Sequence, residues 1–217
     1  MKLTNKVLLA VAVLFLFSLN SFAQVTDSDG NAYKTVTIGK QVWMAENLNV
    51  TKYQNGDPIP QCTDLKEWAS LKTGAWCYYK FDAENGKVYG KLYNWYAVSD
   101  PRGLAPKGWH IPSKEEWSEM VNSLGGDAIA GGKLKATTLW ADPNTEATNE
   151  SGFTALPGGS LGFENTFGYQ KMAGMFWTST EVTTTTAAQF YLVYEDAVVF
   201  RVDNNKKSGL SVRCIKD

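Results

Sequence analysis

The chain has 217 residues, of which 44% are hydrophobic and 13% aromatic, and its 21 basic side chains nearly balance its 22 acidic ones. That much apolar material excludes a disordered chain, and 19 glycines and 7 prolines without a period exclude a collagen-like one. A formal net charge of −1 provides no basic surface for nucleic acid or an anionic membrane. The composition indicates a globular protein and leaves its ligand open.

The N-terminal segment has the pattern of a secretory signal peptide. Two lysines precede the unbroken apolar run 7–17, and small residues stand before a cut at Gln24. The run is shorter than the ~20 residues of a membrane span, and the residue after the cut is not cysteine. We therefore expect a chain that is secreted or held in the cell envelope (periplasm or outside) and is not a lipoprotein. The predicted divisions are a signal peptide at 1–23, a polar leader at 24–32 and a single domain at 33–217.

The first half of the domain alternates strand patterns with turn residues. Gly39-Lys40 separates two alternating segments, which is typical of a hairpin. Asp64 with Glu67 three residues later resembles a capping box and predicts a helix start. We expect strands over 33–38, 41–45, 75–81 and 88–98, and a short helix over 65–71.

The strongest helix signal follows in the middle of the chain. Ser113 and Glu116 form a capping box, apolar residues then recur at helical spacing, and Gly125-Gly126 ends the pattern, which predicts a helix over 114–124. The segment 125–168 is irregular but carries enough apolar residues to be packed. Three further strands are expected over 187–194, 197–203 and 210–216, as a meander. The predicted class is α+β with an antiparallel sheet.

Three cysteines occur in this expected export substrate, so at most one internal disulfide can form. Cys77 and Cys214 lie in strand patterns, whereas Cys62 lies in a polar loop. Two cysteines held in a sheet are better placed for bridging than one in a loop. We therefore expect a Cys77–Cys214 disulfide. The alternative is buried free thiols, which are common in protein cores.

Seven segments, in order, resemble the Fibrobacter succinogenes major paralogous domain, a family of exported bacterial domains without an established activity. The resemblance runs from about residue 29 to the C-terminal end. Together the seven segments are specific, although each alone is weak. They are 42–48 (VWMAENL), 90–98 (GKLYNWYAV), 108–117 with GWHIPS and EW, 131–135 (GGKLK), 149–159 with NESGF and ALPGG, 176–181 (FWTSTE) and 211–217 (SVRCIKD).

A more distant resemblance reaches the formylglycine-generating, sulfatase-modifying group with its C-type-lectin-like fold. It is carried by 111–117, 152–153, 176–179 and 212–214. This resemblance implies a small twisted antiparallel sheet, one or two short helices and long packed loops. The enzymes of that group hold copper with two nearby cysteines, whereas Cys214 is the only cysteine after residue 77. We therefore do not expect copper oxidase chemistry.

Other catalytic constellations are equally poorly represented. His110 is the only histidine, and its position just before the capped helix favours a structural role. Adjacent acids such as Glu115 and Glu116 point apart on a helix and usually face solvent. We expect no enzyme and name no catalytic residue.

The binding signals are aromatic and weakly calcium-like. Of the eight tryptophans at least six should be core, and Trp140 is the exception because it lies in the long irregular segment. Asp142-Pro143-Asn144 is similar to the tripeptide with which C-type lectins bind calcium and sugar, although an ordinary turn has the same residues. Calcium is the one cofactor considered, and no metal-ligand set is predicted. The expected ligand-binding residues are Trp140, Asp142, Asn144, Asn149 and Glu150.

The sequence thus predicts an exported, non-enzymatic recognition module that binds a carbohydrate or a protein partner at the cell envelope. It predicts no nucleic-acid partner and no membrane span after signal cleavage. Two alternatives stay open. A glycan-acting enzyme would place two carboxylates ~5–10 Å apart across a cleft. A structural scaffold would have no polar, concave site for a small ligand.

Overall fold

The computed structural model describes residues 24–217, so the expected signal segment 1–23 lies outside the described residues. The five α-helices and one 3-10 turn described are α1 (Leu65–Ser70), η1 (Tyr79–Phe81), α2 (Ala83–Tyr89), α3 (Trp95–Val98), α4 (Lys114–Ser123) and α5 (Asp127–Leu134). The strands described are β1 (Gln24–Thr26), β2 (Ala32–Ile38), β3 (Gln41–Met44), β4 (Trp76–Cys77), β5 (Leu92–Tyr93), β6 (Trp109–His110), β7 (Ser160–Leu161), β8 (Phe167–Gly168), β9 (Ala173–Glu181), β10 (Thr186–Val193), β11 (Phe200–Asn205) and β12 (Ile215–Lys216).

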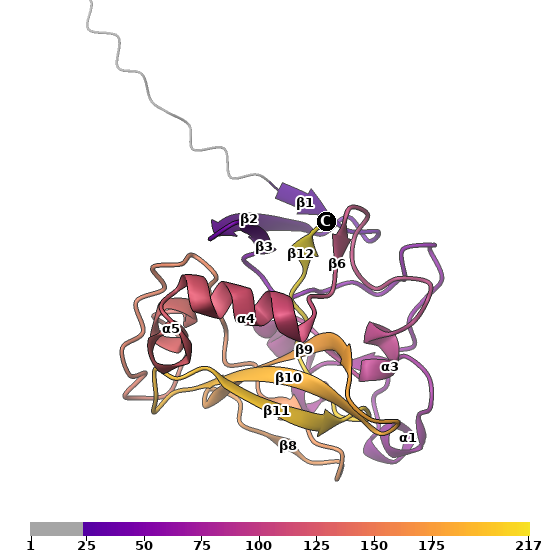
Figure 1. Cartoon of the computed structure of the whole chain (residues 1–217). Coiled ribbons are helices and arrows are strands. Elements are labelled where there is room, and N and C mark those ends of the chain that lie inside the picture. The colour runs from indigo at the N-terminus through magenta and orange to yellow at the C-terminus, as the bar shows by residue number, and fades with distance from the viewer. Residues whose placement is uncertain (1–23) are drawn as a thin grey trace, which may run out of the picture.

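The described chain combines helices with two main antiparallel sheets (Figure 1). One sheet has the order β1-β2-β3-β12-β6, and the other is the twisted hairpin sheet β11-β10-β9. Because β12 inserts between β3 and β6, the C-terminal strand lies in the same sheet as the first strands. Helix α4 packs on β9 and β10 and also contacts the β2–β3 hairpin, so it lies between the two sheets. No helix within residues 24–217 is both long and apolar enough for a membrane crossing.

Several local predictions are confirmed. Strands β2 and β3 form the expected hairpin, with Val36 opposite Trp43. Asp64 caps α1 by accepting from the backbone N–H groups of Lys66 and Glu67. The complete capping box between Ser113 and Glu116 begins α4. In each case a short-range hydrogen bond determines the element, which is why the sequence pattern is sufficient.

Two of the predicted strands are wrong over most of their length. Residues 75–81 form only the two-residue strand β4 before the turn η1, and 88–98 contains the end of α2, the short β5 and α3. The aromatic residues of these segments favour strand, but side-chain caps override them. Asp82 accepts from the N–H of Glu84 and starts α2, and Asn94 accepts from the N–H of Ala97 and starts α3.

The predicted C-terminal meander is also only partly formed. Strand β10 occurs as expected, but β11 begins at Phe200, and β12 joins the other sheet and does not follow β11. The long segment 125–168, which was expected to be irregular, holds helix α5 with the glycine pair Gly131-Gly132 inside it. Glycine is unfavourable within a helix, but here it is required. The reason is close packing, because a Cβ on Gly131 would lie 2.4 Å from the carbonyl oxygen of Ala197.

An aromatic cluster beneath α4 joins the helix to both sheets. The Trp117 ring of α4 stacks on Phe190 of β10 at 5.1 Å and meets Trp43 of β3 edge-on at 5.2 Å. Phe153 and Phe176 complete the cluster, and both are fully buried. Seven of the eight tryptophans are buried, which confirms that most of them serve the core.

The expected Cys77–Cys214 disulfide is not formed, and this prediction is corrected. Cys62, Cys77 and Cys214 are all buried free thiols. Cys77 lies in an apolar cluster with Trp68 and Leu161, whereas Cys214 lies in the separate cluster around Tyr93. The strand prediction is confirmed for Cys77, which ends β4, but Cys214 lies outside the strands, directly before β12.

A buried lysine fastens the irregular segment to the three-stranded sheet. Lys135 is fully buried, and its ammonium group donates to the carbonyl oxygens of Thr145, Val193 and Asp196 at 2.9, 3.0 and 2.7 Å. Burial lowers the pKa of Lys135 to about 8, partly offset by the charge of Asp196. The loop is therefore ordered by a side chain and not by a strand.

We expect Lys135→Met to destabilise the chain by about 3 kcal/mol, because methionine fills the space but leaves three buried carbonyls without a donor. The free energy of unfolding in urea measures this. Lys133→Met is the matched control, since Lys133 makes a surface ion pair with Glu150 that contributes at most about 1 kcal/mol. Equal losses in the two variants would contradict a structural role for the buried ammonium.

Candidate functional site

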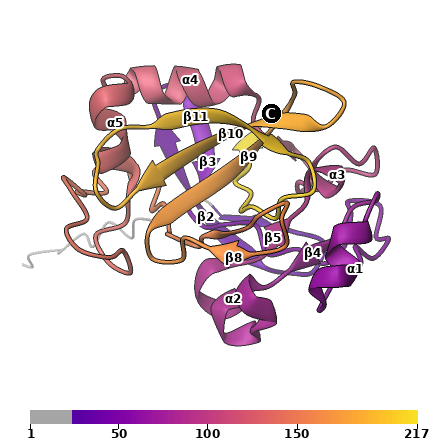
Figure 2. The ribbon, with the colours of Figure 1, turned by 90° about the horizontal axis from the view of Figure 1, so that it is seen from below.

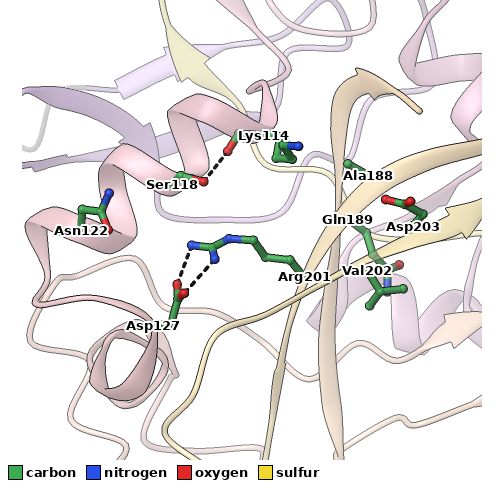
Figure 3. Close-up of a pocket in the computed structure, with 9 residues that line it drawn as sticks. All are labelled: Lys114, Ser118, Asn122, Asp127, Ala188, Gln189, Arg201, Val202 and Asp203. Carbon is green, nitrogen blue, oxygen red and sulfur yellow. Dashed lines mark hydrogen bonds and ion pairs between the residues drawn. The ribbon is translucent and has the colours of Figure 1, made fainter.

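A cleft of about 550 Å³ opens between α4, the start of α5 and the strands β10 and β11 (Figure 3). Figure 2 shows α4 passing along the three-stranded sheet, and the lining residues come from the facing parts of these elements and from the start of α5. Most of its side chains are polar or charged, which distinguishes it from the aromatic cluster below. The lining residues are Lys114, Ser118, Asn122, Asp127, Ala188, Gln189, Arg201, Val202 and Asp203.

One wall of the cleft is a polar row on α4. Lys114, Ser118 and Asn122 are four residues apart, so they lie one above another on one side of the helix. The buried residues Trp117 and Val121 lie on another side, in the aromatic cluster. Core packing thus fixes how the helix is rotated, and the rotation presents the polar row to the cleft.

The opposite wall comes from the edge strand β11. The antiparallel register places Arg201 opposite Phe190 and Asp203 opposite Ala188. Because side chains of directly opposed residues share a face, Arg201 and Asp203 lie on the same face as Phe190, which stacks on Trp117 of α4. The guanidinium of Arg201 lies 5.2 Å from the Phe190 ring centre. The sheet therefore points one cation and one anion toward α4.

An ion pair closes one end of the cleft. Arg201 makes two parallel hydrogen bonds to the carboxylate of Asp127, at the start of α5, with Nη1 donating to Oδ2 at 2.7 Å. Both side chains are partly exposed, so solvent screens the pair, and its contribution to stability is about 1 kcal/mol or less. Its main effect is geometric, because the fork holds the guanidinium in one orientation.

Two charged groups of the cleft have no partner of this kind. Within residues 24–217, neither the Lys114 ammonium nor the Asp203 carboxylate takes part in an ion pair. In Figure 3 the Asp203 carboxylate likewise has no marked contact with another residue that lines the cleft. The cleft therefore offers a free cation, a free carboxylate and the amide of Asn122 to a ligand.

The cleft lacks an activated nucleophile among the described residues. Its one hydroxyl, on Ser118, donates to the Lys114 carbonyl oxygen at 2.8 Å, as an ordinary helix contact. His110 lies outside the cleft, where Nδ1 and Nε2 each lie 2.8 Å from a carboxylate oxygen, of Asp217 and Glu116 respectively. His110 therefore joins β6, α4 and the end of the chain, in line with the structural role expected from its place before the helix.

The structure places the five sequence-predicted ligand residues outside this cleft. Trp140 is 9% exposed, and its indole N–H donates to the Ala155 carbonyl oxygen at 3.1 Å, so little of the ring is open to a sugar. Asp142 is exposed. Asn144 donates to the Ala136 carbonyl oxygen, and its own buried Oδ1 has no hydrogen-bond partner.

The remaining two predicted residues are used within the fold. The Asn149 side chain bonds both to the Thr154 hydroxyl and to the Thr154 backbone N–H. Glu150 pairs with Lys133 at 2.9 Å. In the part of the chain that the structure describes, no three or more His, Cys, Asp or Glu side chains gather as a metal site would require. Trp140, Asn144, Asn149 and Glu150 thus each bond to a partner within the fold, whereas the Asp142 side chain is exposed and forms no such bond among the described residues.

Sequence reasoning missed the cleft as a whole. The spacing of Lys114, Ser118 and Asn122 predicts the solvent-exposed face of an amphipathic helix. Alone, it does not indicate a binding site. Arg201 and Asp127 are 74 residues apart, so no motif connects them. The one available signal was Arg201 opposite Phe190 in the expected pair of strands. Using it would have required the correct strand register.

A comparison with known families covers nearly the whole described chain. Residues 36–216 match the Fibrobacter succinogenes major domain. The chain belongs to this family. The matched region begins in β2 and ends in β12, so it includes both main sheets and the cleft, and it confirms the resemblance seen in the sequence. No curated protein and no solved structure matches the chain.

We expect the pKa of His110 to lie above its ordinary value of 6.5. Burial lowers it, but hydrogen bonds and charge from Asp217 and Glu116 outweigh burial. The resulting stabilisation is fully present below the unfolded pKa and is lost as pH rises through the folded pKa. An NMR titration of the ring measures the shift in the folded chain and in urea.

Two variants separate the causes of this shift. Asp217→Asn and Glu116→Gln should each lower the His110 pKa, and glutamine can still accept from the Ser113 N–H and so keep the helix cap. A folded-state pKa at or below the urea value would contradict the double ion pair.

Proposed function

We propose that this family member is a non-enzymatic recognition module that binds a hydroxyl-rich ligand, a carbohydrate, in the α4–β11 cleft. The observation that carries the proposal is a set of polar groups that line its two walls, of which Lys114 and Asp203 form no ion pair within residues 24–217. Lys114 and Asn122 lie on the helix and Asp203 on the sheet, while Arg201 is held by Asp127. Such groups donate to and accept from vicinal hydroxyls, and charge strengthens each hydrogen bond.

The C-type-lectin-like arrangement is part of the proposal. It is supported by two small antiparallel sheets, short helices and a long segment, 135–159, that is ordered by packing and without extended strands. We also propose that the chain acts at the cell envelope, secreted and without a lipid anchor. The pattern of residues 1–23 and the absence of a cysteine at position 24 support this location.

Binding without reaction is favoured over glycan hydrolysis. Asp127 and Asp203 both line the cleft, as a paired-carboxylate enzyme would require. However, both oxygens of Asp127 accept from Arg201. Both carboxylate oxygens are therefore directed to the guanidinium and not to the open part of the cleft, where a substrate would lie.

A protein partner is the second candidate, favoured by a different surface. Around the β7–β8 hairpin, Phe163, Tyr169 and Met172 are 53%, 59% and 42% exposed. They border a hollow of about 440 Å³. Neighbouring exposed apolar side chains of this size are typical of interaction surfaces.

We expect Asp203→Ala to weaken glycan binding at least about tenfold, because it removes an unpaired, charged acceptor worth roughly 1.5–3 kcal/mol in a hydrogen bond. The purified chain would be probed on a broad glycan array, once with calcium and once with EDTA. Asp142→Ala is the matched control, because Asp142 is an exposed aspartate outside the cleft.

The outcomes separate the proposals. If Asp142→Ala or EDTA abolished binding while Asp203→Ala left it unchanged, the binding site would be the calcium-like tripeptide and not the cleft. Binding removed only by Tyr169→Ala would point to the hairpin surface. Shortening of the bound glycan, seen by mass spectrometry, would make the protein an enzyme. No binding by the wild-type chain would leave a protein partner or a scaffold role.

A further inference from the structure

Two of the three free cysteines lie in the same small apolar cluster. Cys62 and Cys77 are 1% and 0% exposed, and they share this cluster with Trp68, Leu92 and Leu161. Cys214 belongs to a different cluster. The pairing expected from the sequence joined Cys77 to a cysteine of the other cluster.

The backbone brings these two cysteines to the same level. The N–H of Cys62 donates to the Trp76 carbonyl oxygen at 2.9 Å, and the N–H of Trp76 donates to the Pro60 carbonyl oxygen at 3.0 Å. These bonds pair Gln61 with Trp76 in a parallel bridge. One residue further along both parallel segments, Cys62 therefore lies beside Cys77, and their side chains are on the same face.

That placement suits a disulfide. Neighbouring strands lie about 4.7–4.9 Å apart, and disulfides join residues whose Cα atoms are about 4.4–6.8 Å apart. Both side chains point into one cluster, so the sulfur atoms can meet without moving a sheet. A bridge would close the segment 62–77, which contains α1.

We propose that Cys62 and Cys77 are a disulfide-forming pair, oxidised by exchange with an external disulfide. The thiolate of one cysteine attacks the external disulfide, forms a mixed disulfide and releases one thiol. The second cysteine, as its thiolate, then attacks the Sγ of the first cysteine. This forms the Cys62–Cys77 bond, breaks the mixed disulfide and releases the second external thiol. The chain loses two hydrogens and two electrons, and the external disulfide gains both.

Cys62 is the entry point of this exchange. Its thiol lies beneath the start of α1, 3.1 Å from the Asp64 carbonyl oxygen and 3.5 Å from Glu67 Oε2. Burial raises the pKa of both thiols, more strongly for Cys77. The native chain should therefore oxidise slowly, through local opening of α1, and faster during folding.

The bond would fasten α1 where it contacts the end of β11. The Trp68 indole N–H donates to the Lys207 carbonyl oxygen at 2.7 Å, and Lys207 Nζ donates to the Ala69 carbonyl oxygen at 2.9 Å. Lys207 follows β11 by two residues, and β11 provides Arg201 and Asp203 to the cleft. The disulfide thus limits opening on the side of the fold that carries this strand.

The test is oxidation of the reduced chain with oxidised glutathione, both in the folded state and during refolding from urea. The expected product is lighter by about 2 Da than the reduced chain. Non-reducing trypsin digestion should link peptide 53–66, which holds Cys62, to peptide 73–80, which holds Cys77. Oxidation should also raise Tm by several degrees, since it closes a loop in the unfolded chain.

Matched cysteine variants make the result decisive. Cys214→Ser should still form the link and show the rise in Tm, whereas Cys62→Ser and Cys77→Ser should show neither. A link that involves Cys214 would overturn the proposal. So would a refolded wild-type chain, with native circular dichroism, that carries only free thiols or glutathione adducts.

Discussion

The guanidinium of Arg213 lies fully buried where β3 and the residues before β12 meet the long irregular segment, and it forms no ion pair within residues 24–217. It donates to the carbonyl oxygens of Met44 and Phe153 and to the side-chain oxygen of Asn47. Burial lowers its pKa, but the ordinary guanidinium value lies so far above neutral pH that the charge remains. A charge in this position is tolerated only because every donor direction is used.

The position of this charge also connects the fold to the cleft. The Arg213 guanidinium lies 4.3 Å from the Phe153 ring centre and 5.7 Å from that of Phe176. These two rings contact Trp117, which lies on α4 and stacks on Phe190 of β10. One continuous set of contacts thus runs from the buried cation to both walls of the cleft. The polar row on α4 faces β11 because packing of Trp117 in the aromatic cluster fixes how the helix is rotated.

Elements that depend on neighbours in sequence were predictable, and elements that depend on distant partners were not. Ser113 and Glu116 cap α4 within one turn, so the sequence alone was sufficient. Asn94 was read as part of a strand, because its bonds to the N–H groups of Ala75 and Ala97 cannot be inferred from aromatic neighbours. The candidate site is of the second kind, since Arg201 reaches Asp127 only after β10, β11 and α5 have packed.

Two buried cations explain how a chain with so much irregular backbone can be ordered. Lys135 and Arg213 together bond five backbone carbonyl oxygens at or below 3.1 Å, most of them in segments outside strands and helices. Each buried carbonyl needs a donor, and in a regular element the donor is a neighbouring N–H. Here long side chains supply it, so these buried carbonyl oxygens have donors although the loops form no ladder. Composition gave no sign of this, because 21 basic residues would ordinarily face solvent.

Urea unfolding of Arg213→Met measures most directly how much the buried guanidinium contributes to the stability of the fold. Methionine keeps much of the volume but leaves several buried acceptors without donors, and we expect a loss of about 3–5 kcal/mol. Arg201→Met, which removes a partly exposed arginine, should lose about 1 kcal/mol or less. Equal, small losses in the two variants would show that Arg213 does not hold the fold together and would contradict the account.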